Sequence, residues 1–148
     1  MFIKLQPDQV PLFWEMIRHC VIQAYKIPKK FQQDFGIKYL ENILSGLCQA
    51  WIGYKLDKEG KKRINFIFTT KIIDEKYNGV KILGIDSLYG FRMVSVASMD
   101  EVYKNFEIYA KANNCHGIVT DYSSERVKQF LDSQGFETYK SSCKRMFD

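Results

Sequence analysis

The sequence predicts an α+β fold in which helices cover both faces of a mixed central sheet, and two observations lead to this prediction. The first half contains two stretches with helical spacing of apolar residues, followed by three strand-like runs joined by short turns. The second half alternates helix-like and strand-like segments, which is the pattern of parallel crossover connections. The predicted order of elements is therefore β-α-α-β-β-β-α-β-α-β.

Apolar periodicity and two prolines define the first three elements. Residues 2–5 alternate between apolar and polar character and predict a short strand. Apolar residues then recur at helical spacing through residues 12–24. Pro11 suits the first turn of this helix, and Pro28 ends it because proline disfavours helical geometry in the residue before it. A second helix is predicted from the apolar face within residues 31–44.

Three consecutive strands are predicted for the middle of the chain, over residues 49–56, 63–74 and 80–91. Residues 57–62 are charged and contain a glycine, so they predict the first connecting turn. The second connection contains Asn78-Gly79, a strong hairpin signal because both residues tolerate positive φ. These strands are expected to pair as an antiparallel meander.

The rest of the chain predicts a helix, a strand, a short helix and a last strand. The third long helix is expected to begin at Ser98, because Ser98 and Glu101 have the spacing of a capping box. A buried strand is predicted over residues 116–122, a short helix over 123–134 and a final strand over 135–147. No internal repeat is visible.

Length and composition predict a single domain spanning residues 1–148. The 148 residues are 46% hydrophobic and 26% charged, which is ordinary for a globular domain of this size. No apolar run reaches the ~18 residues that a membrane span needs, and the N-terminus lacks the features of a signal peptide. We therefore expect no membrane association and a cytoplasmic location, or a place in a virus particle or another assembly.

Charge and cysteine content limit the other function classes. The formal net charge is +5, carried by 17 lysines and five arginines. Lysine-rich clusters at residues 26–30 and 58–62 fall in predicted loops, where a solvated turn is the ordinary interpretation. Nucleic-acid binding would need these cations on one face together with stacking aromatics, so it is the third hypothesis for this chain. The cysteines are far apart, so they predict buried free thiols and no metal site. They are Cys20, Cys48, Cys115 and Cys143.

The order of elements and two local patterns resemble the GNAT superfamily of N-acyltransferases. The first pattern is the strand at 116–122, the helix at 123–134 and Gly135-Phe136, which opens the last strand. Serines at 123 and 124 stand where the family often has asparagine. Leu131 stands where the family often has a tyrosine that acts as a general acid. The resemblance implies a GNAT-like fold, a cosubstrate of acetyl-CoA or another acyl-CoA, and transfer of the acyl group to an amine.

The second pattern is the segment "RMVSVA" (92–97), which resembles the acyl-CoA loop of the family with serine in place of its first glycine. In such a loop, converging backbone N–H groups and the start of the following helix bind the pyrophosphate. An alternative register places the loop at residues 94–99. The resemblance implies the following cofactor-binding residues: Leu88, Gly90, Arg92, Met93, Val94, Ser95, Val96, Ala97 and Ser123.

Acyl transfer to an amine requires that the amine lose a proton and that the leaving thiolate gain one. Asp86, just before the loop, is the candidate base; the alternative is an ordinary hydrogen-bonded aspartate. Tyr122 is the first candidate for the proton donor and Tyr139 the second, although packing roles are the alternative for both. His19 and His116 are isolated in the sequence and are interpreted as structural or solvated.

Two hypotheses of different classes remain open at the level of sequence. The first is an active acyl-CoA N-acyltransferase whose acceptor is a small amine, a peptide N-terminus or a lysine. The second is a catalytically silent GNAT-fold protein that works in an assembly, for example as a viral component. Few residues follow Gly135, so the last strand is expected to have an open edge. Self-association or another protein chain would cover that edge.

Overall fold

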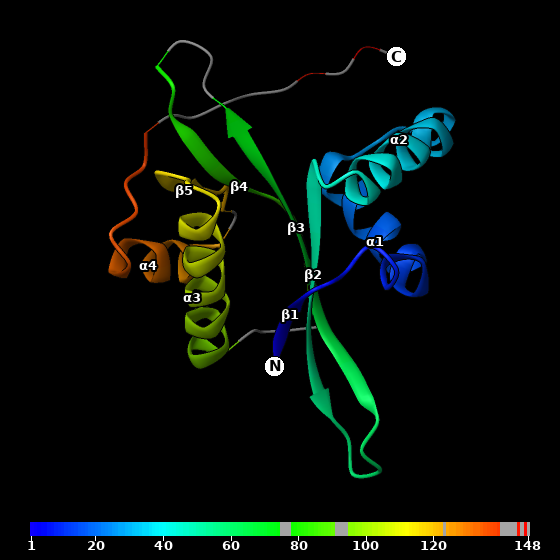
Figure 1. The fold of residues 1–148 in the computed structure, drawn as a ribbon, viewed down its shortest axis with the longest axis horizontal. Helices are drawn as coiled ribbons and strands as arrows, with labels where there is room; N and C mark the ends of the chain where they lie inside the picture. Colours follow the sequence, from blue (N-terminus) through cyan, green and yellow to red (C-terminus); the bar gives the residue numbers. More distant parts are fainter. Residues whose placement is uncertain (75–77, 91–94, 123, 140–144, 146, 148) are drawn as a thin grey trace.

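The computed structural model describes residues 1–74, 78–90, 95–122 and 124–139, together with Arg145 and Phe147. These residues form a five-stranded sheet with helices on both faces (Figure 1). The elements, in chain order, are β1 (Phe2–Lys4), α1 (Val10–Tyr25), the 3-10 helix η1 (Lys29–Phe31), α2 (Gln32–Leu44), β2 (Cys48–Leu56), β3 (Lys62–Asp74), β4 (Lys81–Gly90), α3 (Val96–Ala112), β5 (Gly117–Val119) and α4 (Glu125–Ser133).

The strands lie side by side in the order of the sequence, β1-β2-β3-β4-β5. The pairs from β1 to β4 are antiparallel, and β5 joins β4 in parallel after the crossover through α3. Asp74 pairs with Lys81 at the end of the β3–β4 ladder, and Gly79 between them has a φ of +71°. The antiparallel meander and the hairpin that Asn78-Gly79 predicted are therefore confirmed.

Each face of the sheet has its own apolar core. On one face lie α1 and α2 (Figure 1). Ile17 and Val21 of α1 are buried there in one cluster with Ile52 and Ile67 of the sheet. On the other face, α3 packs Phe106 edge-on against the rings of Phe2, Trp51 and Phe68. The burial of each such side chain is worth about 1.5–3 kcal/mol. Helices on both faces, as predicted, follow from apolar residues on both sides of the central strands.

The start of α3 differs from the prediction. Ser95 has extended backbone geometry, and its hydroxyl oxygen accepts a hydrogen bond from the Ser98 N–H at 3.1 Å. Ser95 is therefore the N-cap, and the prediction of a capping box that begins at Ser98 is wrong. Ser98 lies inside the first turn, because the chain is already helical from Val96.

The second half of the chain contains less strand than predicted. β5 covers Gly117–Val119 within the predicted strand at 116–122, because β4 and β5 diverge beyond it. Residues 136–139 belong to neither a helix nor a strand, so the predicted last strand is absent there. Of its other residues, the structure describes Gly135, Arg145 and Phe147, which also lie outside any helix or strand. Within the described ranges, no helix is both long enough and apolar enough to cross a bilayer.

Candidate functional site

The two parallel strands of the sheet part in the middle of β4. β5 pairs with β4 from Ile82 to Gly84, where Gly84 faces Val119. β4 then continues from Ile85 to Gly90 without a partner in β5. In open sheets, ligands bind beyond the carboxyl ends of parallel strands, where the chain leaves the two strands in different directions. The diverging ends of β4 and β5 therefore mark the first place to look for a site.

A β-bulge re-aims the side chains of β4 just beyond this point. Thr69 of β3 pairs with Ser87, and Thr70 pairs with Ile85, so Asp86 is an extra residue without a partner on β3. Because side chains alternate along a regular strand, adjacent residues should face opposite sides of the sheet. Here Asp86 and Ser87 both face α1 and α2: Asp86 contacts Tyr25, and Ser87 contacts Cys20.

Asp86 is the centre of a polar cluster under α1 and α2. The Tyr25 hydroxyl donates to Oδ1 and the Tyr39 hydroxyl donates to Oδ2, each at 2.5 Å. The Lys71 ammonium lies 3.0 Å from Oδ1. The Asp86 side chain is only 6% exposed, whereas that of Lys71 is 42% exposed. The carboxylate is thus fully engaged by two tyrosines and one lysine.

A chain of hydrogen bonds leads from Asp86 toward α1. The Thr69 hydroxyl lies 2.9 Å from the Tyr39 hydroxyl and also contacts the Ser87 hydroxyl. Ser87 in turn lies 3.4 Å from the Cys20 sulfur. Each hydroxyl has one proton to donate. Since Tyr39 donates to the carboxylate, Thr69 must donate to Tyr39, and Ser87 to Thr69.

Burial and the charge of Asp86 keep the donors of this cluster protonated. Burial, and then the hydrogen bond to Asp86, raises the pKa of Tyr25 and of Tyr39 well above the ordinary tyrosine range. Burial is also the main reason why the pKa of the Cys20 thiol rises to about 11. The cluster therefore holds one negative charge, on Asp86, and one positive charge, on Lys71.

The structure places part of the predicted acyl-CoA loop at the start of α3. Ser95 is exposed and caps the helix, and Val96 and Ala97 in the first turn are exposed as well. The first hydrogen bond of the helix runs from the Met99 N–H to the Ser95 oxygen. The N–H groups of Val96 and Ala97 precede that bond and point out of the helix start, as an anion site requires.

The other predicted cofactor residues belong to β4 or are not described. Leu88 pairs with Phe68 and is 48% exposed, and Gly90 pairs with Phe66 at the end of the strand. The predictions for Arg92, Met93, Val94 and Ser123 fall outside the described residues.

Tyr122 and Tyr139 line one groove on the opposite side of the sheet from Asp86. The groove has a volume of about 820 Å³ and runs between the second half of α3, the β5 segment and α4. This volume suits a small-molecule site. Lys128 of α4 also lines it. The groove does not include Ser95–Ala97, so the structure brings the two candidate proton donors together but separates them from Asp86 and from the start of α3.

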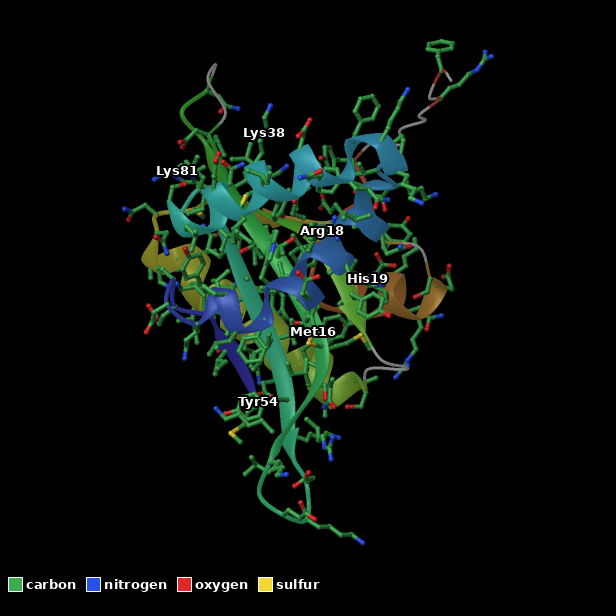
Figure 2. All side chains as sticks on the ribbon, turned by 90° about the vertical axis from the view of Figure 1, so that its right-hand side faces the viewer. Met16, Arg18, His19, Lys38, Tyr54 and Lys81 are labelled. Carbon is green, nitrogen blue, oxygen red and sulfur yellow. The ribbon has the colours of Figure 1, made fainter. Side chains whose placement is uncertain are left out.

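A second, smaller hollow lies between α1 and the end of β4. Its volume is about 240 Å³, and it is lined by Glu15, Met16, His19 and Tyr89. Met16 and His19 lie on α1, which crosses the face of the sheet (Figure 2). The His19 ring packs edge-on against Tyr89 at 5.1 Å, which agrees with a packing role.

The remaining candidates have structural partners. His116 accepts a hydrogen bond from the Lys81 N–H at 3.1 Å through Nδ1. Cys20 and Cys48 are buried free thiols, whereas Cys115 is half-buried and Cys143 lies outside the described residues. In the part of the chain that the structure describes, no group of 3 or more His, Cys, Asp or Glu could hold a metal ion.

The whole described fold matches solved acetyltransferases. A probable acetyltransferase superposes with a TM-score of 0.70 at 12% identity, over 100% of this chain and 99% of the other. A predicted acetyltransferase from Clostridium acetobutylicum, solved with acetyl-CoA, gives 0.69 at 13% identity, over 99% and 95%. Glucosamine-6-phosphate N-acetyltransferase from Arabidopsis thaliana gives 0.65 at 16% identity, over 100% and 98%.

The chain has the GNAT fold. This likeness rests on structure, since no protein-family model and no curated protein matches the sequence. The predicted fold class, a mixed sheet with GNAT-like element order, is confirmed over the described residues. Within the GNAT fold, Ser95 and the start of α3 lie in the segment 92–97, for which the sequence resemblance predicted a loop.

Sequence reasoning identified Asp86 but not the residues around it. Tyr25 and Tyr39 are 61 and 47 residues away along the chain, and both lie on helix faces whose period predicts only core packing. Lys71 lies within a strand rich in β-branched residues. The one signal in the sequence was that these polar residues lie on otherwise apolar faces. That signal does not reveal that their side chains contact Asp86.

Proposed function

We propose that this chain is an N-acyltransferase that moves an acetyl or another acyl group from acyl-CoA to an amine. The observation that carries the proposal is the parting of β4 and β5 after Gly84, with the exposed start of α3 as the next element along the chain after β4. Full-length similarity to acetyltransferases, one of them solved with acetyl-CoA, supports it. The acceptor is a small amine, a peptide N-terminus or a lysine.

The start of α3 fits the phosphate-bearing part of acyl-CoA. Exposed N–H groups at a helix start favour an anion, and the small side chain of Ala97 leaves room for its approach. Ser95 already caps one donor, the Ser98 N–H, so the N–H groups of Val96 and Ala97 would carry the contact. Bound acyl-CoA would supply a thioester, whose C–S bond breaks as the amine nitrogen forms the new C–N bond.

Two residues of the chain are assigned to the protons in this proposal. Asp86 would take the proton that the amine loses, because it is a carboxylate on β4 just beyond the divergence. Tyr122 would give a proton to the leaving thiolate from the segment after β5, with Tyr139 in the same groove as the second candidate.

A second function is favoured by one observation. Asp86 is already paired with Lys71 and engaged by two tyrosines, which suits a stabilising role more than that of a base. The alternative is therefore a catalytically silent GNAT-fold assembly protein. In that case we expect self-association, or a partner chain, at the edge of β5.

The test is release of free thiol from acetyl-CoA with a panel of amines. We expect amine-dependent release that falls by a factor of about 10² or more in Asp86→Asn, as loss of a general base predicts. The rate of thiol release should fall further in Tyr122→Phe than in Tyr139→Phe, which is its matched control in the same groove. The assembly protein would be favoured if thiol release does not depend on the amine. It would also be favoured if the three variants release thiol at the same rate as the wild type.

A further inference from the structure

We propose that Asp86, Tyr25 and Tyr39 form a receptor for a primary alkylammonium group, which Lys71 fills in the free protein. In this proposal, Lys71 is an internal occupant that an external amine can replace. The receptor itself requires no acyl-CoA. Only the conclusion about which amine is the acceptor rests on the proposed function.

The contacts leave one cation position at the carboxylate. Each tyrosine hydroxyl donates to a different oxygen of Asp86, and the raised pKa of both keeps them as neutral donors. Neither supplies positive charge. A carboxylate this deeply buried needs a cation partner, because burial of an uncompensated charge is very unfavourable. Lys71 is the ion-pair partner that the described residues provide, at 3.0 Å from Oδ1.

The Asp86 side chain is buried and that of Lys71 is partly exposed, which is what a replaceable occupant of a buried receptor requires. The carboxylate is 6% exposed, whereas the Lys71 side chain is 42% exposed. The binding group is thus fixed in the core, while the cation reaches it from solvent on a flexible four-carbon stem. The stem is thus partly open to solvent, so another ammonium on a similar stem can take its place.

The position of Lys71 ties the receptor to the diverging strands. Lys71 of β3 pairs with Gly84, the last residue of β4 that β5 pairs with. Its ammonium contacts Asp86, two residues beyond Gly84 on β4, and so lies near the point where the two strands part. On the helix side of Asp86, the rings of Tyr25, Phe35 and Tyr39 pack against one another.

If the proposed function holds, the receptor names the class of acceptor as an unhindered primary amine on an unbranched chain, such as a lysine side chain. The acceptor would enter as its ammonium, which must lose two protons on the way to the amide: one would go to Asp86, and the other would go to the leaving thiolate. The product amide is neutral, so it would lose the ion pair and leave. Asp86 would then release its proton to solvent, and Lys71 would return.

The experiment removes the internal occupant and supplies an external one. Lys71→Ala deletes the Cγ, Cδ, Cε and Nζ atoms, which n-propylammonium replaces atom for atom. We expect the variant to melt a few degrees below wild type in sodium chloride, and n-propylammonium chloride to recover at least half of that loss along a saturating curve. Tetramethylammonium chloride at equal concentration should recover none of it, because it has no N–H to donate.

Two controls separate a receptor from a general salt effect. Lys71→Met keeps the stem and loses the charge, so n-propylammonium should stabilise it less than half as much as Lys71→Ala. The double variant Lys71→Ala/Asp86→Asn removes both charges of this cluster and should show no difference between the two ammonium salts. Comparable effects of both salts on all proteins would overturn the proposal.

The result remains decisive if Lys71→Ala does not fold alone. Folding restored by n-propylammonium, but not by tetramethylammonium, would support the receptor; no folding in either salt would overturn it. Since no step uses acyl-CoA, an inactive protein that still shows this rescue would reject only the acyltransferase proposal. An active protein without the rescue would reject only the receptor.

Discussion

Deprotonation of Cys20 would place a second negative charge in the hydrogen-bond chain that ends at Asp86. Sγ of Cys20 contacts the Ser87 hydroxyl at 3.4 Å, and the chain continues through Thr69 and Tyr39 to the carboxylate. Burial contributes most to the raised thiol pKa, and the charge of Asp86 adds to it. The chain is therefore complete only while its sulfur end stays protonated.

This arrangement predicts a loss of stability at alkaline pH. The thiol pKa is about 11 in the folded protein against an ordinary 9.0, so the unfolded chain releases its proton first. The free energy of unfolding should hold below pH 9 and fall by about 2–3 kcal/mol between pH 9 and 11 from this group. Urea unfolding of Cys20→Ala should show a shallower fall over that window, and an unchanged slope would contradict the assignment.

At the scale of the element, the start of α3 depends on Ser95. Ser95→Ala removes the acceptor of the Ser98 N–H and should lower the free energy of unfolding by about 1 kcal/mol. Ser95→Asp should keep most of the stability, since aspartate is an equally good N-cap. Ser98→Ala, the matched control one turn in, should cost less. A larger loss at Ser98 than at Ser95 in urea unfolding would contradict this helix start.

The accuracy of the sequence prediction differs between elements for physical reasons. The β2–β3–β4 meander and helices α1 and α2 were predictable because their apolar periods span whole elements and clear turn residues separate them. The cap of α3 was missed by three residues because Ser95 and Ser98 both have capping side chains. Backbone geometry, which the sequence does not show, decides between them.

The candidate site was less predictable, because it depends on a β-bulge. A regular β4 would put Asp86 and Ser87 on opposite faces of the sheet. The bulge opposite Thr69 and Thr70 turns both toward the helices, and the composition of β4 does not reveal it. The sheet also separates Tyr122 from Asp86, because Tyr122 lies on the α3–α4 side and Asp86 faces α1 and α2. The sequence does not show on which side of the sheet each residue lies.

At the scale of the whole molecule, the parting of β4 and β5 separates two regions with different chemistry. The α1–α2 face holds the Asp86 cluster, and the α3–α4 face holds the groove with Tyr122 and Tyr139. An acyltransferase would have to bring an amine and a thioester together across this gap. In this fold, acyl-CoA would therefore have to lie between the diverging strands, so that its thioester can be reached from both faces of the sheet.

Binding of acetyl-CoA, measured by thermal unfolding, tests this account most directly. Ligand at 100 times its dissociation constant should stabilise the protein by about 2.7 kcal/mol, a rise in Tm of roughly 5–10 °C. Ala97→Glu, which puts a carboxylate in the first turn of α3, should abolish most of that rise. Ile108→Glu, on the exposed side of the same helix, should keep it. An unchanged Tm at millimolar acetyl-CoA would contradict the account.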